Sequence, residues 1–83
     1  MGETRSEMVE VTKEWLQVSD GTTAVVIQNI GSDTIEVAAA ANGYEPVAGR
    51  RYKTGEAEVY TFSKNLYVRA VNNISKIIIE KGD

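Results

Sequence analysis

Short apolar runs, rich in β-branched residues and separated by turn-forming residues, recur along the whole chain. Several runs alternate, so that Ile35 and Val37 would share one face of a strand while Glu36 lies on the other. Short alternating runs of this kind predict strands rather than helices. About six to seven such strands, at roughly ten-residue spacing, predict an all-β fold, either a small antiparallel β-sandwich or a barrel.

Turn signals indicate how these strands connect. Asp20 and Gly21 tolerate the positive φ of a tight hairpin turn, and residues 31–33 break the chain again. The pattern therefore predicts two successive hairpins that make residues 15–38 a meander. Pro46 disfavours a helix before it, so residues 44–49 are expected to form an extended loop.

The beginning of the chain is ambiguous. Met8, Val11, Trp15 and Val18 recur at helical spacing, which leaves room for a short helix over residues 6–14. The β-branched residues in this segment favour extended structure instead. We expect one domain over residues 1–83, with residues 1–7 disordered and residues 8–80 forming the folded core.

The amino-acid composition excludes much chemistry. The 83 residues include no cysteine and no histidine, so disulfides, Ser-His-Asp relays and the preferred zinc ligands are absent. The paired carboxylates of Glu56 and Glu58 would share one exposed strand face, which is not the cleft geometry of a glycosidase. We therefore expect a non-enzymatic protein without a metal or cofactor. A small core without disulfides or a structural metal leaves oligomerisation as the remaining way to add stability.

The charge and the hydropathy pattern bear on partners. The net charge of −3 disfavours a nucleic-acid binder, which needs a positive field. No apolar run approaches the roughly 20 residues of a membrane span, and the polar residues 1–7 do not resemble the core of a signal peptide. We expect neither a membrane partner nor general secretion.

Three consecutive isoleucines point to a contact surface. If Ile77 and Ile79 face inward, Ile78 must point to the other face, which this small domain cannot cover by itself. We therefore predict a homo-oligomer with Ile78 at the interface. Tyr67 and Arg69 lie opposite the inward residues of their strand and are further interface candidates, whereas Trp15 and Phe62 are expected to fill the core.

Arg50, Arg51 and Lys53 form the densest basic cluster. The cluster could contact an anion, a carboxylate or an acidic partner. It could also be a solvated loop that balances an acidic chain, and the absence of a glycine-rich phosphate loop favours this second interpretation.

The strand and turn pattern resembles small virion structural proteins of tailed bacteriophages. The similar segments are Trp15 to Thr22, Val26 to Gly31, Ile35 to Ala38, Glu58 to Phe62 and Leu66 to Ala70. The resemblance spans roughly residues 15–80 and implies a compact β-sandwich that ends in a strand reading Tyr-x-Arg-Ala, here residues 67–70. It implies a particle component (capsid decoration, head fibre or knob, tail or baseplate), often a trimer, found in the virion and in the host cytoplasm before assembly.

Two other function classes remain open. A carbohydrate-binding or adhesin module would need an exposed aromatic platform built from Tyr44, Tyr52 or Tyr67. A nucleic-acid-binding barrel would need Arg69 to converge on one face with the basic cluster of residues 50–53.

Overall fold

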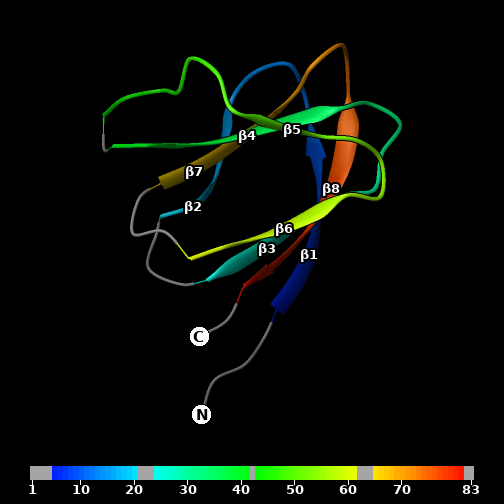
Figure 1. The fold of residues 1–83 in the computed structure, drawn as a ribbon, viewed down its shortest axis with the longest axis horizontal. Helices are drawn as coiled ribbons and strands as arrows, with labels where there is room; N and C mark the ends of the chain where they lie inside the picture. Colours follow the sequence, from blue (N-terminus) through cyan, green and yellow to red (C-terminus); the bar gives the residue numbers. More distant parts are fainter. Residues whose placement is uncertain (1–4, 21–23, 42, 62–64, 82–83) are drawn as a thin grey trace.

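The fold is an all-β sandwich, one of the two all-β architectures that the sequence predicts. A computed structural model describes residues 5–20, 24–41, 43–61 and 65–81. The described residues form eight strands and no helix (Figure 1). The strands are β1 (Arg5–Val11), β2 (Leu16–Ser19), β3 (Val25–Asn29), β4 (Ile35–Ala40), β5 (Arg50–Tyr52), β6 (Ala57–Tyr60), β7 (Asn65–Ala70) and β8 (Ser75–Lys81).

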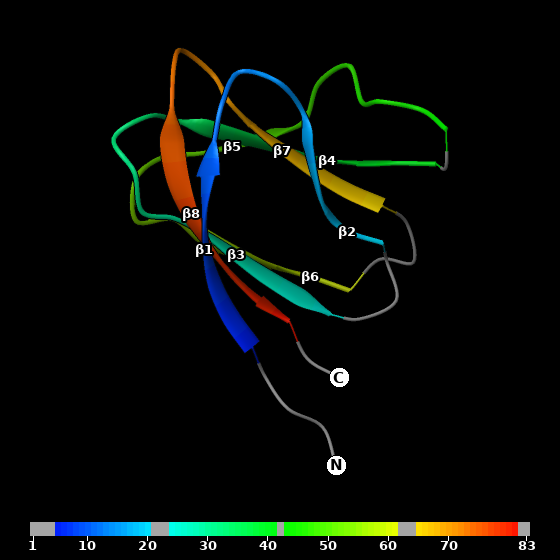
Figure 2. The ribbon, with the colours of Figure 1, turned by 180° about the vertical axis from the view of Figure 1, so that it is seen from behind.

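The strands form two four-stranded antiparallel sheets. Sheet A has the order β1-β8-β3-β6, and sheet B has the order β2-β7-β4-β5. The strands pair as β1 with β8, β2 with β7, β3 with β6 and β4 with β5, which is the topology of a jelly roll. The two layers are visible from both sides of the molecule (Figures 1 and 2).

β1 corrects the prediction for the beginning of the chain. The helix considered over residues 6–14 is wrong, and β1 begins at Arg5, within the residues expected to be disordered. β1 pairs with β8 along its full length, from Arg5 opposite Lys81 to Val11 opposite Ser75. Pairing with a central strand stabilises extended structure, and Val9 and Val11 turn toward the core while Met8 faces outward.

The predicted meander over residues 15–38 is also wrong. β2 pairs with β7, and β3 pairs with β8 and β6, so neighbouring strands in the sequence lie in different sheets. Gly21 lies outside the described residues. A turn signal reports that the chain reverses locally, but it does not distinguish a hairpin from a connection between two sheets.

The core lies between the two sheets and is almost entirely aliphatic. Its buried members are Val11, Val18, Val25, Ile27, Ile35, Val37, Tyr60, Leu66, Val68, Ala70, Ile77 and Ile79. Within β8 the inward Ile77 and Ile79 flank the half-buried Ile78, which confirms the predicted alternation. Burial of these side chains from both sheets is the main stabilising contribution to the domain.

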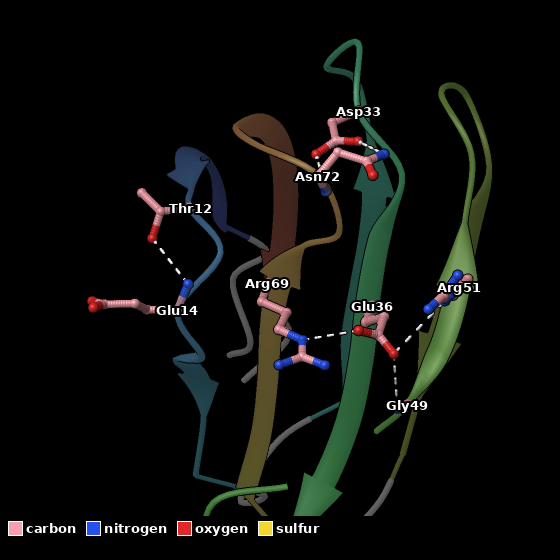
Figure 3. Close-up of polar contacts among 8 residues, drawn as sticks. All are labelled: Thr12, Glu14, Asp33, Glu36, Gly49, Arg51, Arg69 and Asn72. Carbon is pink, nitrogen blue, oxygen red and sulfur yellow. Dashed lines mark hydrogen bonds and ion pairs between the residues drawn. The ribbon is translucent and has the colours of Figure 1, made fainter. Parts of the chain in front are cut away.

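A polar cluster holds together two connections at one end of the sandwich. The carboxylate of Asp33, which follows β3, accepts a hydrogen bond at 2.8 Å from the backbone N–H of Asn72 (Figure 3) and another at 2.8 Å from that of Asn73. Beside it, the buried Asn29 side chain donates to the carbonyl of Asp33 at 2.7 Å and accepts from the Ser75 hydroxyl at 2.8 Å. The β3–β4 and β7–β8 connections are therefore linked by side chains as well as by the sheets.

We predict that the core and outer isoleucines of β8 differ sharply in their contribution to stability. Ile77→Ala should lower the free energy of unfolding by about 2–5 kcal/mol, because it leaves a cavity, and the milder Ile77→Val by about 0.5–1.5 kcal/mol. Ile78→Ala removes the same atoms from the outer face and should cost less than about 1 kcal/mol. Urea denaturation at low protein concentration measures all three, and equal costs at both positions would contradict the assigned faces.

We also predict a pH-dependent contribution from Asp33. The backbone N–H of Asn73, with further hydrogen bonds from Asn72 and Thr34, lowers the pKa of Asp33 despite its burial. A lowered folded-state pKa gives stability that is present above the ordinary carboxyl pKa of about 4 and is lost as the pH falls through the folded value. Asp33→Asn should therefore lower the melting temperature at pH 7, and its difference from the wild type should shrink in acid. Glu45→Gln, in an exposed loop, is the matched control.

Candidate functional site

The structure places the predicted interface residues on two opposite faces of the sandwich. Ile78 lies on the outer face of sheet A, because its neighbours Ile77 and Ile79 belong to the core. Tyr67 and Arg69 lie on the outer face of sheet B, because Leu66, Val68 and Ala70 of the same strand belong to the core. The domain therefore has two separate candidate contact surfaces.

A row of charged side chains crosses the outer face of sheet B. Arg69 on β7, Glu36 on β4 and Arg51 on β5 lie side by side in the strand register. The Arg69 Nε donates to Glu36 Oε1 at 2.8 Å, and the Arg51 Nε lies 3.8 Å from Glu36 Oε2 (Figure 3). Two cations thus hold one carboxylate between them.

Glu36 is buried although it points away from the core. Its relative exposure is 4%, and the backbone N–H of Gly49 in the β4–β5 connection donates to Oε2 at 3.4 Å. A side chain at position 49 would meet the carbonyl oxygen of Val37 at 2.3 Å, so only glycine permits this close approach. Burial raises the pKa of Glu36, but the hydrogen bonds from Arg69 and Gly49 and the charges of both arginines outweigh it and lower that pKa.

Trp15 is part of this outer face. The guanidinium of Arg69 lies 4.3 Å from the centre of the Trp15 ring, in cation–π geometry. Trp15 is half-buried and is not a member of the core, so the prediction that it fills the core is wrong. Aliphatic residues fill the interior, while the ring covers a charged side chain whose burial it supports. Phe62, the other predicted core aromatic, lies outside the described residues.

The basic cluster does not converge. Arg50 and Arg51 are adjacent on β5 and point to opposite faces: Arg51 approaches Glu36, and Arg50 lies 3.6 Å from the Glu58 carboxylate on β6. The backbone N–H of Lys53 donates to Glu56 at 2.6 Å. Arg51 and Arg69 share the outer face of sheet B with Glu36 between them, whereas Arg50 points to the other face. The three arginines therefore do not form the single positive face that a nucleic-acid-binding barrel would need.

The three tyrosines considered for sugar binding occupy different environments. Tyr44 is 71% exposed in the β4–β5 connection. Tyr52 turns inward, and its hydroxyl forms a 2.5 Å hydrogen bond with that of buried Tyr60, whose pKa is raised by burial and by this contact. Tyr67 is half-buried on the outer face of sheet B. Tyr52 is thus not available to a platform with the others.

The outer face of sheet A has an apolar stripe, which we define as Met8, Ile78, Val26 and Val59. The strand register places Met8 beside Ile78 and Val26 beside Val59, with one residue from each of the four strands of the sheet. Gln28 is the direct neighbour of Ile78 on β3, so the stripe passes diagonally from Ile78 to Val26. Met8 is 64% exposed and Val59 is 61% exposed, while Ile78 and Val26 are half-buried. Sequence reasoning found Ile78 but missed Met8 and Val59, because their proximity depends on strand pairings distant in sequence.

The described part of the chain contains few groupings of side chains suited to metal binding. Among these residues no group of three or more His, Cys, Asp and Glu side chains could hold a metal ion. A shallow hollow of about 260 Å³ near the β4–β5 connection is lined mainly by small apolar residues, with Arg50 and Tyr60 as its large polar members. No helix in the described ranges is long and apolar enough to cross a membrane.

Comparisons with known proteins identify a shared fold. No known protein family matches the sequence, and no curated protein matches it significantly. A de novo designed double-stranded β-helix gives a TM-score of 0.65 at 21% identity, over 93% of this chain and 97% of the design. A cupin-2 domain protein from Shewanella frigidimarina gives 0.59 at 18% identity, over 95% and 68% of the two chains. A chain of the disulfide-linked pili that form Bacillus endospore appendages gives 0.54 at 7% identity, over 99% and 85%.

We predict that Glu36 stabilises the outer face of sheet B through its two arginines. Glu36→Gln should lower the free energy of unfolding by about 1–3 kcal/mol, because it leaves half-buried Arg69 without its anion. The fluorescence of Trp15, the single tryptophan, should shift to the red as Arg69 becomes less ordered. Glu58→Gln removes the partner of Arg50 in an exposed pair and should leave both readings nearly unchanged. Equal effects of the two variants would contradict this account.

Proposed function

We propose that the protein is a non-enzymatic structural subunit of a bacteriophage virion, as a capsid decoration, head-fibre, knob or tail component. It would act by contacting copies of itself and other particle proteins. The resemblance over residues 15–80 suggests this class, and the apolar stripe on sheet A is the observation that supports a contact function most directly.

The stripe is costly for an isolated domain. Met8 and Val59 on the two edge strands of this sheet remain exposed to water, and half-buried Ile78 and Val26 lie on the strands between them. Exposed apolar side chains grouped on one face are typical of an interaction site. Polar substitutions at Met8 or Val59 would leave the core intact, so the fold itself does not require apolar residues there. A partner that covers the stripe would explain them.

The jelly-roll fold is compatible with this role, but the fold alone does not distinguish it from other functions. The fold occurs in viral capsid proteins, lectins and cupins, so function has to be argued from surfaces. One fold neighbour belongs to pili, which supports the idea that such a domain can build assemblies. Because this chain contains no cysteine, its contacts would be non-covalent rather than disulfide-linked.

A carbohydrate-binding or adhesin module is the second candidate. The strongly exposed Tyr44 is the observation that favours it, since exposed aromatic rings stack on sugars. Tyr52 faces inward, which leaves less of the platform that this function requires. Binding on a glycan array that Tyr44→Ala abolishes would establish it in place of the virion proposal.

We predict that the protein is present in many copies in purified phage particles, as measured by quantitative mass spectrometry. The double variant Met8→Glu, Val59→Glu should fold, because both side chains are exposed, but should be depleted from particles at least about tenfold. Tyr44→Glu is the control and should be incorporated normally. Consistent absence of the wild-type protein from particles would contradict the proposal, and loss only in Tyr44→Glu would place the contact elsewhere.

A further inference from the structure

Opposite charges of β8 flank Ile78 on the outer face of sheet A. On β8, Lys76 and Glu80 both point to this face, two residues before and two residues after Ile78. The register sets Ile78 in a row with Met8, Gln28 and Ala57, and the row containing Glu80 and that containing Lys76 lie on either side. Lys76 and Glu80 thus lie at equal distances from a central row that is apolar except for Gln28, and Glu10 of β1 lies beside Lys76.

We propose that the sheet A face binds a second copy of this chain across a two-fold axis that runs along the Ile78 row. This proposal deepens the proposed function and rests on its premise that the apolar stripe is a contact surface. The axis places Ile78 against Ile78 of the second copy and Met8 against Met8. It also places Lys76 of each copy opposite Glu80 of the other, which makes two equivalent ion pairs.

The charges discriminate among two-fold arrangements. An axis parallel to β8 and directly above it would place Lys76 against Lys76 and Glu80 against Glu80, and like charges in contact are destabilising. An axis parallel to the strands but between β8 and β3 would place Glu80 against Val26 and leave a carboxylate unpaired in an apolar contact. The axis along the Ile78 row avoids both costs.

The area of the face predicts a weak contact. Four strands at about 4.8 Å spacing and about five residues of rise give roughly 300 Å² of flat sheet, and side-chain relief brings the total buried in a dimer to roughly 1,000–1,200 Å². This value lies at the lower end for specific interfaces. We therefore expect a dimer that forms reversibly and depends on concentration, with a dissociation constant in the micromolar to millimolar range.

The test is charge exchange at the two exposed positions, with sedimentation equilibrium up to about 1 mM. The wild-type protein should approach twice the monomer mass of 9.1 kDa. Lys76→Glu and Glu80→Lys should each raise the dissociation constant about tenfold or more, since each places like charges at two symmetric contacts. An equimolar mixture of these two variants should form a heterodimer, and the double variant Lys76→Glu, Glu80→Lys should recover wild-type association.

Controls and contrary outcomes separate this inference from the virion proposal. Lys53→Glu and Glu45→Lys make the same net-charge changes at exposed positions off this face and should leave association unchanged, with circular dichroism confirming that every variant folds. A monomer at all concentrations, or a trimer insensitive to the charge exchange, would overturn the two-fold contact. Detection in particles would still support the virion role in that case, whereas absence from particles with intact dimerisation would remove the virion role alone.

Discussion

The mutual burial of the inner faces of two sheets is the constraint on which this structure depends. The chain contains no cysteine, so its stability comes from packing and hydrogen bonds within a thin core. Each sheet supplies branched aliphatic residues, such as Ile77 and Val25 from sheet A and Ile35 and Val68 from sheet B. Successive side chains of a strand point to opposite faces, so the residues between the buried ones lie on the outer faces of the two sheets. The charge and hydrophobicity of those outer faces depend on these residues.

The two outer faces differ in how far their side chains find partners within the chain. On sheet B, Glu36 is buried between Arg69 and Arg51, and Trp15 covers Arg69, so the face is largely satisfied within the chain. On sheet A, Met8 and Val59 remain exposed beside half-buried neighbours. The charged groups on sheet B thus have partners within the chain, whereas sheet A leaves apolar side chains exposed. This difference makes the outer face of sheet A the better candidate for association.

Local alternation was predictable from the sequence, whereas long-range pairing was not. The inward and outward residues of β7 and β8 were correctly distinguished, because they depend only on the two-residue period of a strand. The meander over residues 15–38 and the helix over residues 6–14 were wrong, because jelly-roll pairing joins strands far apart in sequence, as β1 with β8 shows. Trp15 was misplaced because hydrophobicity alone does not indicate that a ring will cover an arginine. Ile78 was recognised from its neighbours in the sequence, but its position beside Met8 and Gln28 could be found only from the strand register.

Methyl NMR spectroscopy across a concentration series tests the central claim, that the outer face of sheet A is a contact surface, most directly. The account predicts that the methyl resonances of Met8, Ile78, Val26 and Val59 shift together as the protein concentration rises. Those of the buried Ile35 and Val68 should stay fixed. Two results would contradict this claim: shifts that cluster around Trp15 and Tyr67 on sheet B, or sheet A methyl resonances that do not change as the protein concentration rises.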